Sequence, residues 1–136
     1  MNLGDFQEIE PIYNLEFDDF WKPQNLKSEL QNVSSKYIVA KENGEIVGFA
    51  GIWYSVDDAY ITNIVVRKSY RNKGIGSLLL EKLIELAKTK TSLTLEVNTK
   101  NEIAQKLYLK YGFKNLGIRK KYYDGIEDAY IMTLYF

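Results

Sequence analysis

Two glycines, Gly74 and Gly76, stand in a basic segment between an apolar run and a stretch of helical periodicity. The first N–H groups of a helix have no partner within it and lie at the positive end of its dipole, so they bind phosphate groups well. Glycine lets the backbone approach such a ligand closely. Residues 67–91 hold seven bases against two acids, which also favours an anion. The segment therefore predicts a phosphate-binding loop.

The same segment has a simpler interpretation. Surface turns are commonly built with glycine for its conformational freedom and lysine for its charge, and they bind nothing. The spacing of Gly74 and Gly76 differs from that of the P-loop, which needs Gly-x4-Gly-Lys-Ser/Thr, and from that of the dinucleotide fingerprint. From the glycines alone, a surface turn and an anion site both remain open.

The composition removes several kinds of chemistry. The chain of 136 residues has no cysteine and no histidine, which leaves no thiolate nucleophile, no histidine-dependent triad and no usual zinc ligands. We therefore expect no metal. Eighteen bases balance eighteen acids, which argues against a nucleic-acid binder. No run approaches the ~20 apolar residues of a membrane span, so we expect a cytoplasmic protein without membrane contact.

The apolar patterns predict one mixed α/β domain over residues 1–136, because the length fits a single core and no linker interrupts it. Turn signals fit tight hairpins at Asn43-Gly44 and Asp124-Gly125. Strands are expected at Tyr37–Ala40, Ile46–Trp53, Ala59–Val66, Leu93–Val97, Leu116–Tyr123 and Ala129–Phe136. The order strand, helix, strand over residues 59–97 implies one parallel crossover in a mainly antiparallel sheet.

Helices are expected on either side of these strands. Residues 1–32 fit two short helices, the second opened by Pro23. A longer helix begins at Ile75, and its apolar stripe includes Leu78. Another runs from the capping residue Asn101 to Gly112, with Ile103 on its apolar face.

The motifs around the glycines resemble those of the GNAT N-acetyltransferase family. Residues 71–76, Arg-Asn-Lys-Gly-Ile-Gly, match its pyrophosphate motif Arg/Gln-x-x-Gly-x-Gly/Ala. Residues 95–101, 104–108 and 111–113 are similar to the second half of the family's cofactor site. Residues 119–123 and 127–132 are similar to the RimI branch, which acetylates protein N-terminal amines. The resemblance implies a single GNAT domain, acetyl-CoA as cosubstrate and no metal.

The resemblance also implies roles for individual positions. The backbone of Ile64, Val65 and Val66 would contact the acetyl-pantetheine arm, and Asn101 would contact the cofactor further along. Glu96 would accept the proton of the amine, and Tyr108 would lie at the cofactor and donate a proton. The pyrophosphate would be bound by the loop residues Arg71, Asn72, Lys73, Gly74, Ile75, Gly76 and Ser77. At Asn98 the chain departs from the branch, which commonly has arginine there.

Acetyl transfer to an amine needs a base for the ammonium proton and an acid for the departing thiolate. The residues themselves leave the two roles open. Strand alternation alone indicates that Glu96 faces solvent, and helical spacing alone indicates that Tyr108 is a packing residue. With the resemblance, we predict that Glu96 is the base and Tyr108 the acid.

The resemblance implies that the acceptor is a protein N-terminus, with a ribosomal protein as the candidate partner. We expect it in a cleft between the N-terminal helices and the closing hairpin, where seven acids and two bases in residues 1–32 would attract a cation. The predicted aromatic walls are Phe20, Trp21, Tyr122 and Tyr123. Two alternatives remain: transfer to a polyamine, a small-molecule amine or a lysine side chain, and a non-catalytic acyl-CoA-binding domain.

Overall fold

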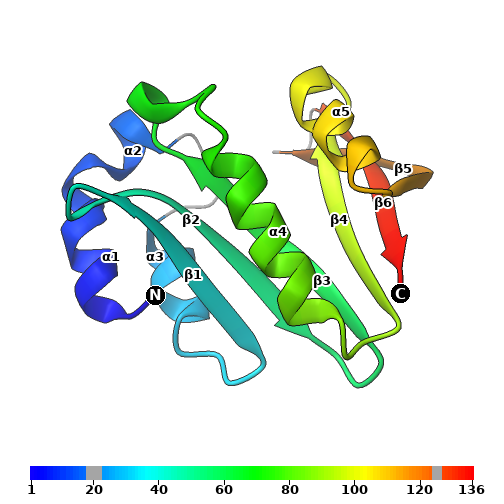
Figure 1. Cartoon of the computed structure of the whole chain (residues 1–136), viewed down its shortest axis with the longest axis horizontal. Coiled ribbons are helices and arrows are strands. Elements are labelled where there is room, and N and C mark those ends of the chain that lie inside the picture. Colours follow the sequence, from blue (N-terminus) through cyan, green and yellow to red (C-terminus); the bar gives the residue numbers. More distant parts are fainter. Residues whose placement is uncertain (18–22, 124–126) are drawn as a thin grey trace.

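In a computed structural model of the chain, residues 1–17, 23–123 and 127–136 are described. Their six strands form one sheet in the order β1-β2-β3-β4-β6-β5 (Figure 1). The strands are β1 (Ser35–Glu42), β2 (Glu45–Tyr54), β3 (Asp58–Val66), β4 (Ser92–Asn98), β5 (Lys114–Tyr123) and β6 (Glu127–Tyr135). The helices are α1 (Leu3–Ile9), α2 (Tyr13–Glu16), α3 (Pro23–Glu29), α4 (Ile75–Ala87) and α5 (Glu102–Lys110), with short 3-10 helices η1 (Glu10–Ile12) and η2 (Lys68–Tyr70).

The sheet has an apolar core on each face. On one face Leu80 and Leu83 of α4 pack against Leu93 and Leu95 of β4. On the other face the aromatic and aliphatic side chains of the N-terminal helices pack against Phe49 and Val65. Strand β2 lies between the two cores, and its residues from Ile46 to Ile52 are all buried. Burial on both faces explains why this strand is a continuous apolar run rather than an alternating one.

Local signals in the sequence predicted several element boundaries correctly. Asn43 and Gly44 have φ values of 53° and 82°, as the predicted two-residue hairpin turn between β1 and β2 requires. Pro23 opens α3, as predicted. The expected first N-terminal helix is interrupted, because Pro11 lies within the 3-10 helix that separates α1 from α2. The predicted turn at Asp124-Gly125 falls outside the described residues.

The parallel crossover is confirmed, but the parallel contact is short. β3 and β4 pair at only three positions: Asp58 with Ser92, Ala59 with Leu93 and Tyr60 with Thr94. β3 then continues along β2 as far as Val66, and β4 continues along β6 as far as Asn98. The two strands therefore diverge toward the end of the sheet where α4 begins and α5 lies (Figure 1).

Two side chains expected on apolar helix faces are exposed instead. Leu78 of α4 is 65% exposed, and Ile103 of α5 is 80% exposed. The face of α4 that meets the sheet is centred on Leu79, Leu80 and Leu83, and Leu78 is rotated by about 100° from Leu79 around the helix axis. Ile103 lies in the first turn of α5, outside the stripe formed by Ala104, Leu107 and Tyr108.

Candidate active site

The predicted phosphate loop leads into α4 with its first N–H groups uncapped by any side chain. Gly74 is the N-cap, with φ 82°, and it makes no side-chain capping hydrogen bond because it has no side chain. Asn72 also has a positive φ, 63°. These left-handed residues turn the chain sharply from η2 into the helix. The amides of Ile75, Gly76 and Ser77 are consequently available to an anion.

Both glycines have open space beside their backbone. A Cβ atom at Gly74 would meet nothing within 4 Å, although the φ of that residue disfavours any L side chain. A Cβ atom at Gly76 would meet only Cγ2 of Val66, at 3.8 Å. The packing of the chain itself therefore does not require glycine at position 76. Space left next to uncapped amides fits a bound pyrophosphate.

The bases of the loop differ in what they contact. Nε of Arg71 donates to the carbonyl oxygen of Val66 at 3.0 Å, which ties the loop to the end of β3. The Lys73 ammonium lies 5.1 Å from the centre of the Tyr70 ring. Arg67 lies 3.6 Å from carboxylate oxygens of Glu16 and of Glu45. Arg67 is thus neutralised locally, while Lys73 is an exposed cation beside the α4 N-terminus.

Three residues of β3 are predicted to contact the pantetheine arm. They lie where β3 separates from β4. Ile64, Val65 and Val66 pair with β2 through one edge of the strand. Their other edge lies beyond Tyr60, where the ladder to β4 ends. Val65 is buried against the N-terminal core, and Ile64 and Val66 are half-buried on the α4 face. The edge of β3 facing β4 thus presents strand backbone beside the phosphate loop.

Glu96 lies on β4, on the face opposite Leu95 and Val97, as the alternation predicted. Its side chain is 24% exposed, so it is neither buried in the core nor fully in solvent. Nη1 of Arg119, on β5, donates to its Oε1 at 2.9 Å. This contact does not follow from the sequence pattern, because it joins strands that are separated by β6 in the sheet.

Tyr108 lies on α5, on the other face of the sheet. Its ring is half-buried and packs against Phe113, with 5.8 Å between ring centres. Burial raises the pKa of Tyr108 to about 12. The hydroxyl therefore keeps its proton at neutral pH, as a proton donor must.

Tyr111, just after α5, connects this helix to the phosphate loop. Its hydroxyl is hydrogen-bonded to the side chains of Glu81 and Ser77, both on α4. Burial, followed by the charge of Glu81, raises the pKa of Tyr111. Ser77, predicted to bind the pyrophosphate, thus also contacts the end of α5.

The junction between β4 and α5 is held by amide side chains. Asn101, predicted to contact the cofactor, caps α5 by accepting from the Ala104 N–H at 3.1 Å. Asn98 donates to Glu127 on β6 and accepts from the Lys100 N–H at 2.9 Å. The hydrogen bond from Asn98, followed by the charge of Lys100, lowers the pKa of Glu127. The side chain at the position where the RimI branch has arginine thus contacts a carboxylate.

The structure describes only part of the predicted acceptor site. Phe20 and Trp21 lie outside the described residues. Tyr122 and Tyr123 lie at the end of β5, where the described part is the backbone. Several acids that were expected to attract the acceptor have structural partners: Asp5 completes the capping box of α1, Oε2 of Glu8 accepts from the Ile46 N–H, and Glu29 contacts Ser35. These contacts hold the side chains in place but leave the carboxylates charged, so the attraction of a cationic acceptor stays a prediction.

Within residues 1–17, 23–123 and 127–136, no group of three or more acidic, histidine or cysteine side chains is arranged to hold a metal ion. In the same ranges no helix is both long and apolar enough to cross a membrane.

The opening between β3 and β4 thus lies beside the uncapped amides at the start of α4. Residues 6–113 match the model of the family described as "Acetyltransferase (GNAT) family", and the chain belongs to this family. It is accordingly an acetyl-CoA-dependent N-acetyltransferase. A GNAT acetyltransferase of Elizabethkingia anophelis, crystallised with acetyl-CoA bound, is 28% identical with a TM-score of 0.74 over 85% of this chain and 84% of that one.

Several relatives within the family have the same name, ribosomal protein S18-alanine N-acetyltransferase. The chain is 36% identical over 136 residues to the [ribosomal protein bS18]-alanine N-acetyltransferase of Haemophilus influenzae, covering 94% of this chain and 92% of the relative. A Bacillus subtilis (strain 168) protein provisionally given the same name is 40% identical, covering 93% and 88%. The crystal structure of the ribosomal-protein-S18-alanine N-acetyltransferase from Escherichia coli is 32% identical with a TM-score of 0.88, covering 99% of this chain and 90% of that one.

Proposed function

We propose that this enzyme acetylates the N-terminal α-amine of a protein and that its acceptor is ribosomal protein bS18. The observation that carries the proposal is the similarity along nearly the whole chain to relatives of that name, in sequence and in structure. The similarity includes the β5–β6 hairpin, which lies outside the matched family segment of residues 6–113. The same acceptor supports a cytoplasmic site of action, since ribosomal proteins are synthesised there.

Acetyl-CoA is proposed to bind across the divergence of β3 and β4. The amides from Asn72 to Ser77 would hold its pyrophosphate, because they are uncapped and have open space beside them. The exposed Lys73 would add positive charge to the same site, and Arg71 would keep the loop attached to Val66. Strand backbone from Ile64 to Val66 would pair with the amide groups of the pantetheine arm and polarise the thioester carbonyl. Asn101 would contact the cofactor, because it lies at the start of α5.

The two proton-transfer roles fit the two faces of β4. Glu96 is on one face, and Tyr108 packs into the core on the other. In the proposed reaction Glu96 takes a proton from the amine, whose nitrogen forms a bond to the acetyl carbon while the carbon–sulfur bond breaks. Tyr108 gives its proton to the departing thiolate. Glu96 then takes the proton of the amine on one side of the strand, and Tyr108 gives its proton to the thiolate on the other side. Neither proton has to pass the reacting acetyl carbon.

An α-amine suits a site of this kind better than a lysine side chain does. Its reference pKa is about 7.7–8.0, against about 10.4 for lysine, so its neutral fraction at pH 7 is roughly 10²–10³ times larger. A single carboxylate without a metal is then sufficient as the base. We retain Phe20, Trp21, Tyr122 and Tyr123 as the proposed walls of the acceptor site.

The proposal is tested by mass spectrometry of an N-terminal bS18 peptide incubated with the enzyme and acetyl-CoA. Acetylation is expected on the α-amine. Preferential acetylation of spermidine or of a lysine side chain would overturn the acceptor. Tight acetyl-CoA binding with no transfer to any amine would indicate a non-catalytic acyl-CoA-binding domain.

A further inference from the structure

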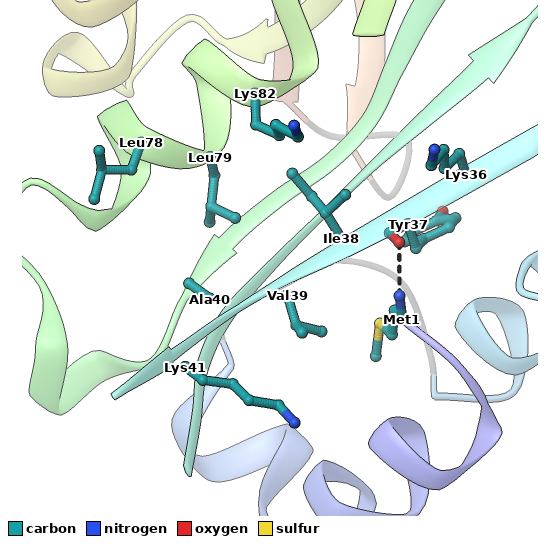
Figure 2. Close-up of a pocket in the computed structure, with 10 residues that line it drawn as sticks. All are labelled: Met1, Lys36, Tyr37, Ile38, Val39, Ala40, Lys41, Leu78, Leu79 and Lys82. Carbon is teal, nitrogen blue, oxygen red and sulfur yellow. Dashed lines mark hydrogen bonds between the residues drawn. The ribbon is translucent and has the colours of Figure 1, made fainter. Parts of the chain in front are cut away.

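Tyr37 of β1 reaches across the neighbouring strand β2 to β3. Ile38, the next residue of β1, extends toward α4, whereas Tyr37 belongs to the core on the opposite face of the sheet (Figure 2). The partner of Tyr37 on β2 is Gly51. A Cβ atom at Gly51 would collide with the Tyr37 ring and with the Thr62 hydroxyl. Glycine at position 51 therefore leaves the space in which the Tyr37 ring crosses β2.

The Tyr37 hydroxyl contacts two consecutive residues of β3. It donates to Oδ1 of Asn63 at 2.8 Å and lies 2.9 Å from Oγ1 of Thr62, within hydrogen-bond distance. Tyr37 and Asn63 are each only 5% exposed, and breaking a buried hydrogen bond is costly because its groups cannot turn to water. Consecutive side chains of a regular strand point to opposite faces. One hydroxyl can therefore bind both residues only where β3 is irregular.

The irregularity is a β-bulge at Thr62. Two neighbouring pairs of the β2–β3 ladder are Gly51 with Asn63 and Ile52 with Ile61. Thr62 is an extra residue of β3 between these pairs. The parallel ladder to β4 ends just before the bulge, at Tyr60, and bulges bend a strand or end its pairing. The bulge thus lies where β3 leaves β4 and the proposed acetyl-CoA site opens.

The bulge also decides which backbone groups of β3 face this opening. In an antiparallel strand the N–H and C=O of one residue point to the same side, and the side alternates along the chain. The Arg67 N–H donates to the Val47 carbonyl oxygen of β2 at 2.8 Å. The backbone groups of Ile64 and Val66 therefore point the other way, into the opening. The Val66 carbonyl oxygen accepts from Nε of Arg71, which agrees with this direction. Without the extra residue, the alternation would turn Ile64 and Val66 toward β2.

We propose that Tyr37 is a positioning residue for acetyl transfer. Its hydroxyl holds the bulge at Thr62, and the bulge directs the N–H groups of Ile64 and Val66 at the acetyl-pantetheine arm. The inference rests on the proposed contact between the β3 backbone and the thioester carbonyl. A donor that is in place before the reaction stabilises the negative charge that develops on the carbonyl oxygen. Tyr37 thus acts on the reaction through β3, from the far side of β2.

The infrared carbonyl band of bound acetyl-CoA tests this placement. Acetyl-CoA with an isotopic label at the acetyl carbonyl carbon is bound to the full chain, and its band is compared with that of the free cofactor. A hydrogen bond to the carbonyl lowers the frequency, so we expect a downshift in the wild type. Tyr37→Phe keeps the ring and removes only the hydroxyl, and it should reduce the downshift by at least half. The Kd of acetyl-CoA should change less than threefold.

Turnover with an N-terminal bS18 peptide gives a second measurement. Tyr37→Phe should lower kcat about tenfold, because the donor acts mainly in the transition state, and the KM of the peptide should change less than twofold. Thr62→Val should act in the same direction, whereas Thr62→Ser keeps the hydroxyl and should retain the wild-type kcat. Tyr54→Phe is the matched control, because its hydroxyl bonds to the Leu86 carbonyl oxygen on the α4 face of the sheet. It should leave kcat and the carbonyl band unchanged.

A folded Tyr37→Phe enzyme with the wild-type kcat and carbonyl band would overturn the proposal, since the hydroxyl would then serve only stability. If Tyr37→Phe does not fold, an unchanged band in Thr62→Val would overturn it instead. A wild-type enzyme that binds acetyl-CoA with no downshift would overturn both this proposal and the proposed contact of the β3 backbone. The band is measured without an acceptor, so an error in the proposed acceptor cannot produce any of these results.

Discussion

Arg119 on β5 reaches across β6 to place its guanidinium 2.9 Å from Oε1 of Glu96 on β4. The arginine side chain is 56% exposed and the glutamate 24%. This exposed cation holds one oxygen of the proposed base. Its positive charge also favours a neutral amine over an ammonium ion beside Glu96. We therefore interpret Arg119 as a positioning residue that acts through Glu96.

Replacing Arg119 by alanine should lower kcat about tenfold and leave the Kd of acetyl-CoA unchanged, since the contact lies on the face away from α4. In a Glu96→Gln background the same replacement should have little further effect, because the two residues act as a unit. Lys120→Ala is the matched control: Lys120 is the neighbouring cation on β5 but contacts Asp128. Steady-state kinetics on the four combinations measures the coupling. Additive losses would mean that Arg119 acts independently of Glu96.

The Glu96→Gln variant tests the base itself. Glutamine keeps the size and the hydrogen-bonding oxygen but cannot accept a proton, so kcat should fall roughly 10²–10⁴-fold. Binding of acetyl-CoA, measured by calorimetry, should be nearly intact. If the variant turned over at the wild-type rate, the proton acceptor would be another group.

The sequence predicted the parts of this site that depend on neighbouring residues in the chain, but not the contacts between residues far apart in the chain. Short-range signals were reliable: Asn43-Gly44 gave the hairpin turn, Asn101 gave the cap of α5, and the glycines gave the loop before α4. The pairing of Arg119 with Glu96 was not predictable in the same way. It depends on the order β4-β6-β5 and on irregularities in the β5–β6 register, between Asn115 and Gly117 and after Arg119. Neither feature follows from the alternation of one strand.

One further expectation went wrong for a related reason. Helical periodicity placed Leu78 in the core, but which part of a helix surface meets the sheet is decided by packing in three dimensions. The attraction of the acceptor by the acids of the first 32 residues stays a prediction, and two of those acids, Asp5 and Glu8, also bind backbone N–H groups. The short β3–β4 ladder, which creates the proposed cofactor site, also had no signal in the sequence of either strand.

The Tyr108→Phe variant tests the proton donor and makes a prediction about pH. Loss of the hydroxyl should slow turnover about 10²-fold. Because burial raises the pKa of Tyr108 to about 12, its ionisation should cause no loss of wild-type activity below about pH 10. Ionisation is easier in the unfolded chain, where the pKa is about 10. Tyr108 therefore favours the folded state below pH 10, and this contribution is lost as the pH rises toward 12.

Urea denaturation at pH 9 and pH 11 measures this contribution to stability. The phenylalanine variant should lose less stability between the two values than the wild type does, because one group that ionises more readily on unfolding has been removed. Tyr135→Phe is a suitable control, since that tyrosine is exposed. An equal pH dependence in wild type and Tyr108→Phe would contradict the burial of the hydroxyl.

Gly76→Val tests the phosphate loop without disturbing the chain itself. The Cβ atom would meet only Val66 at 3.8 Å, so the fold should tolerate it. Its side chain would occupy the space proposed for the pyrophosphate, and acetyl-CoA should bind at least tenfold more weakly, or about 1.4 kcal/mol. Gly76→Ala should have a smaller effect. Gly74→Val is a poorer test, because the φ of 82° would strain the loop even with no ligand. Unchanged affinity in a folded Gly76→Val protein would place the pyrophosphate elsewhere.

The last prediction distinguishes an α-amine from other acceptors by pH. With an N-terminal bS18 peptide, the rate at subsaturating peptide should rise with pH until about 8 and then level off, because the α-amine is then mostly neutral. A matched peptide with its α-amine blocked and an internal lysine free should react at least 10²-fold more slowly at pH 7, and its rate should continue to rise toward pH 10. Initial rates from pH 6 to 10 with both peptides and with spermidine provide the comparison. Similar rates on the two peptides at pH 7 would mean that the site itself deprotonates lysine, and the acceptor would then have to be sought among lysine side chains.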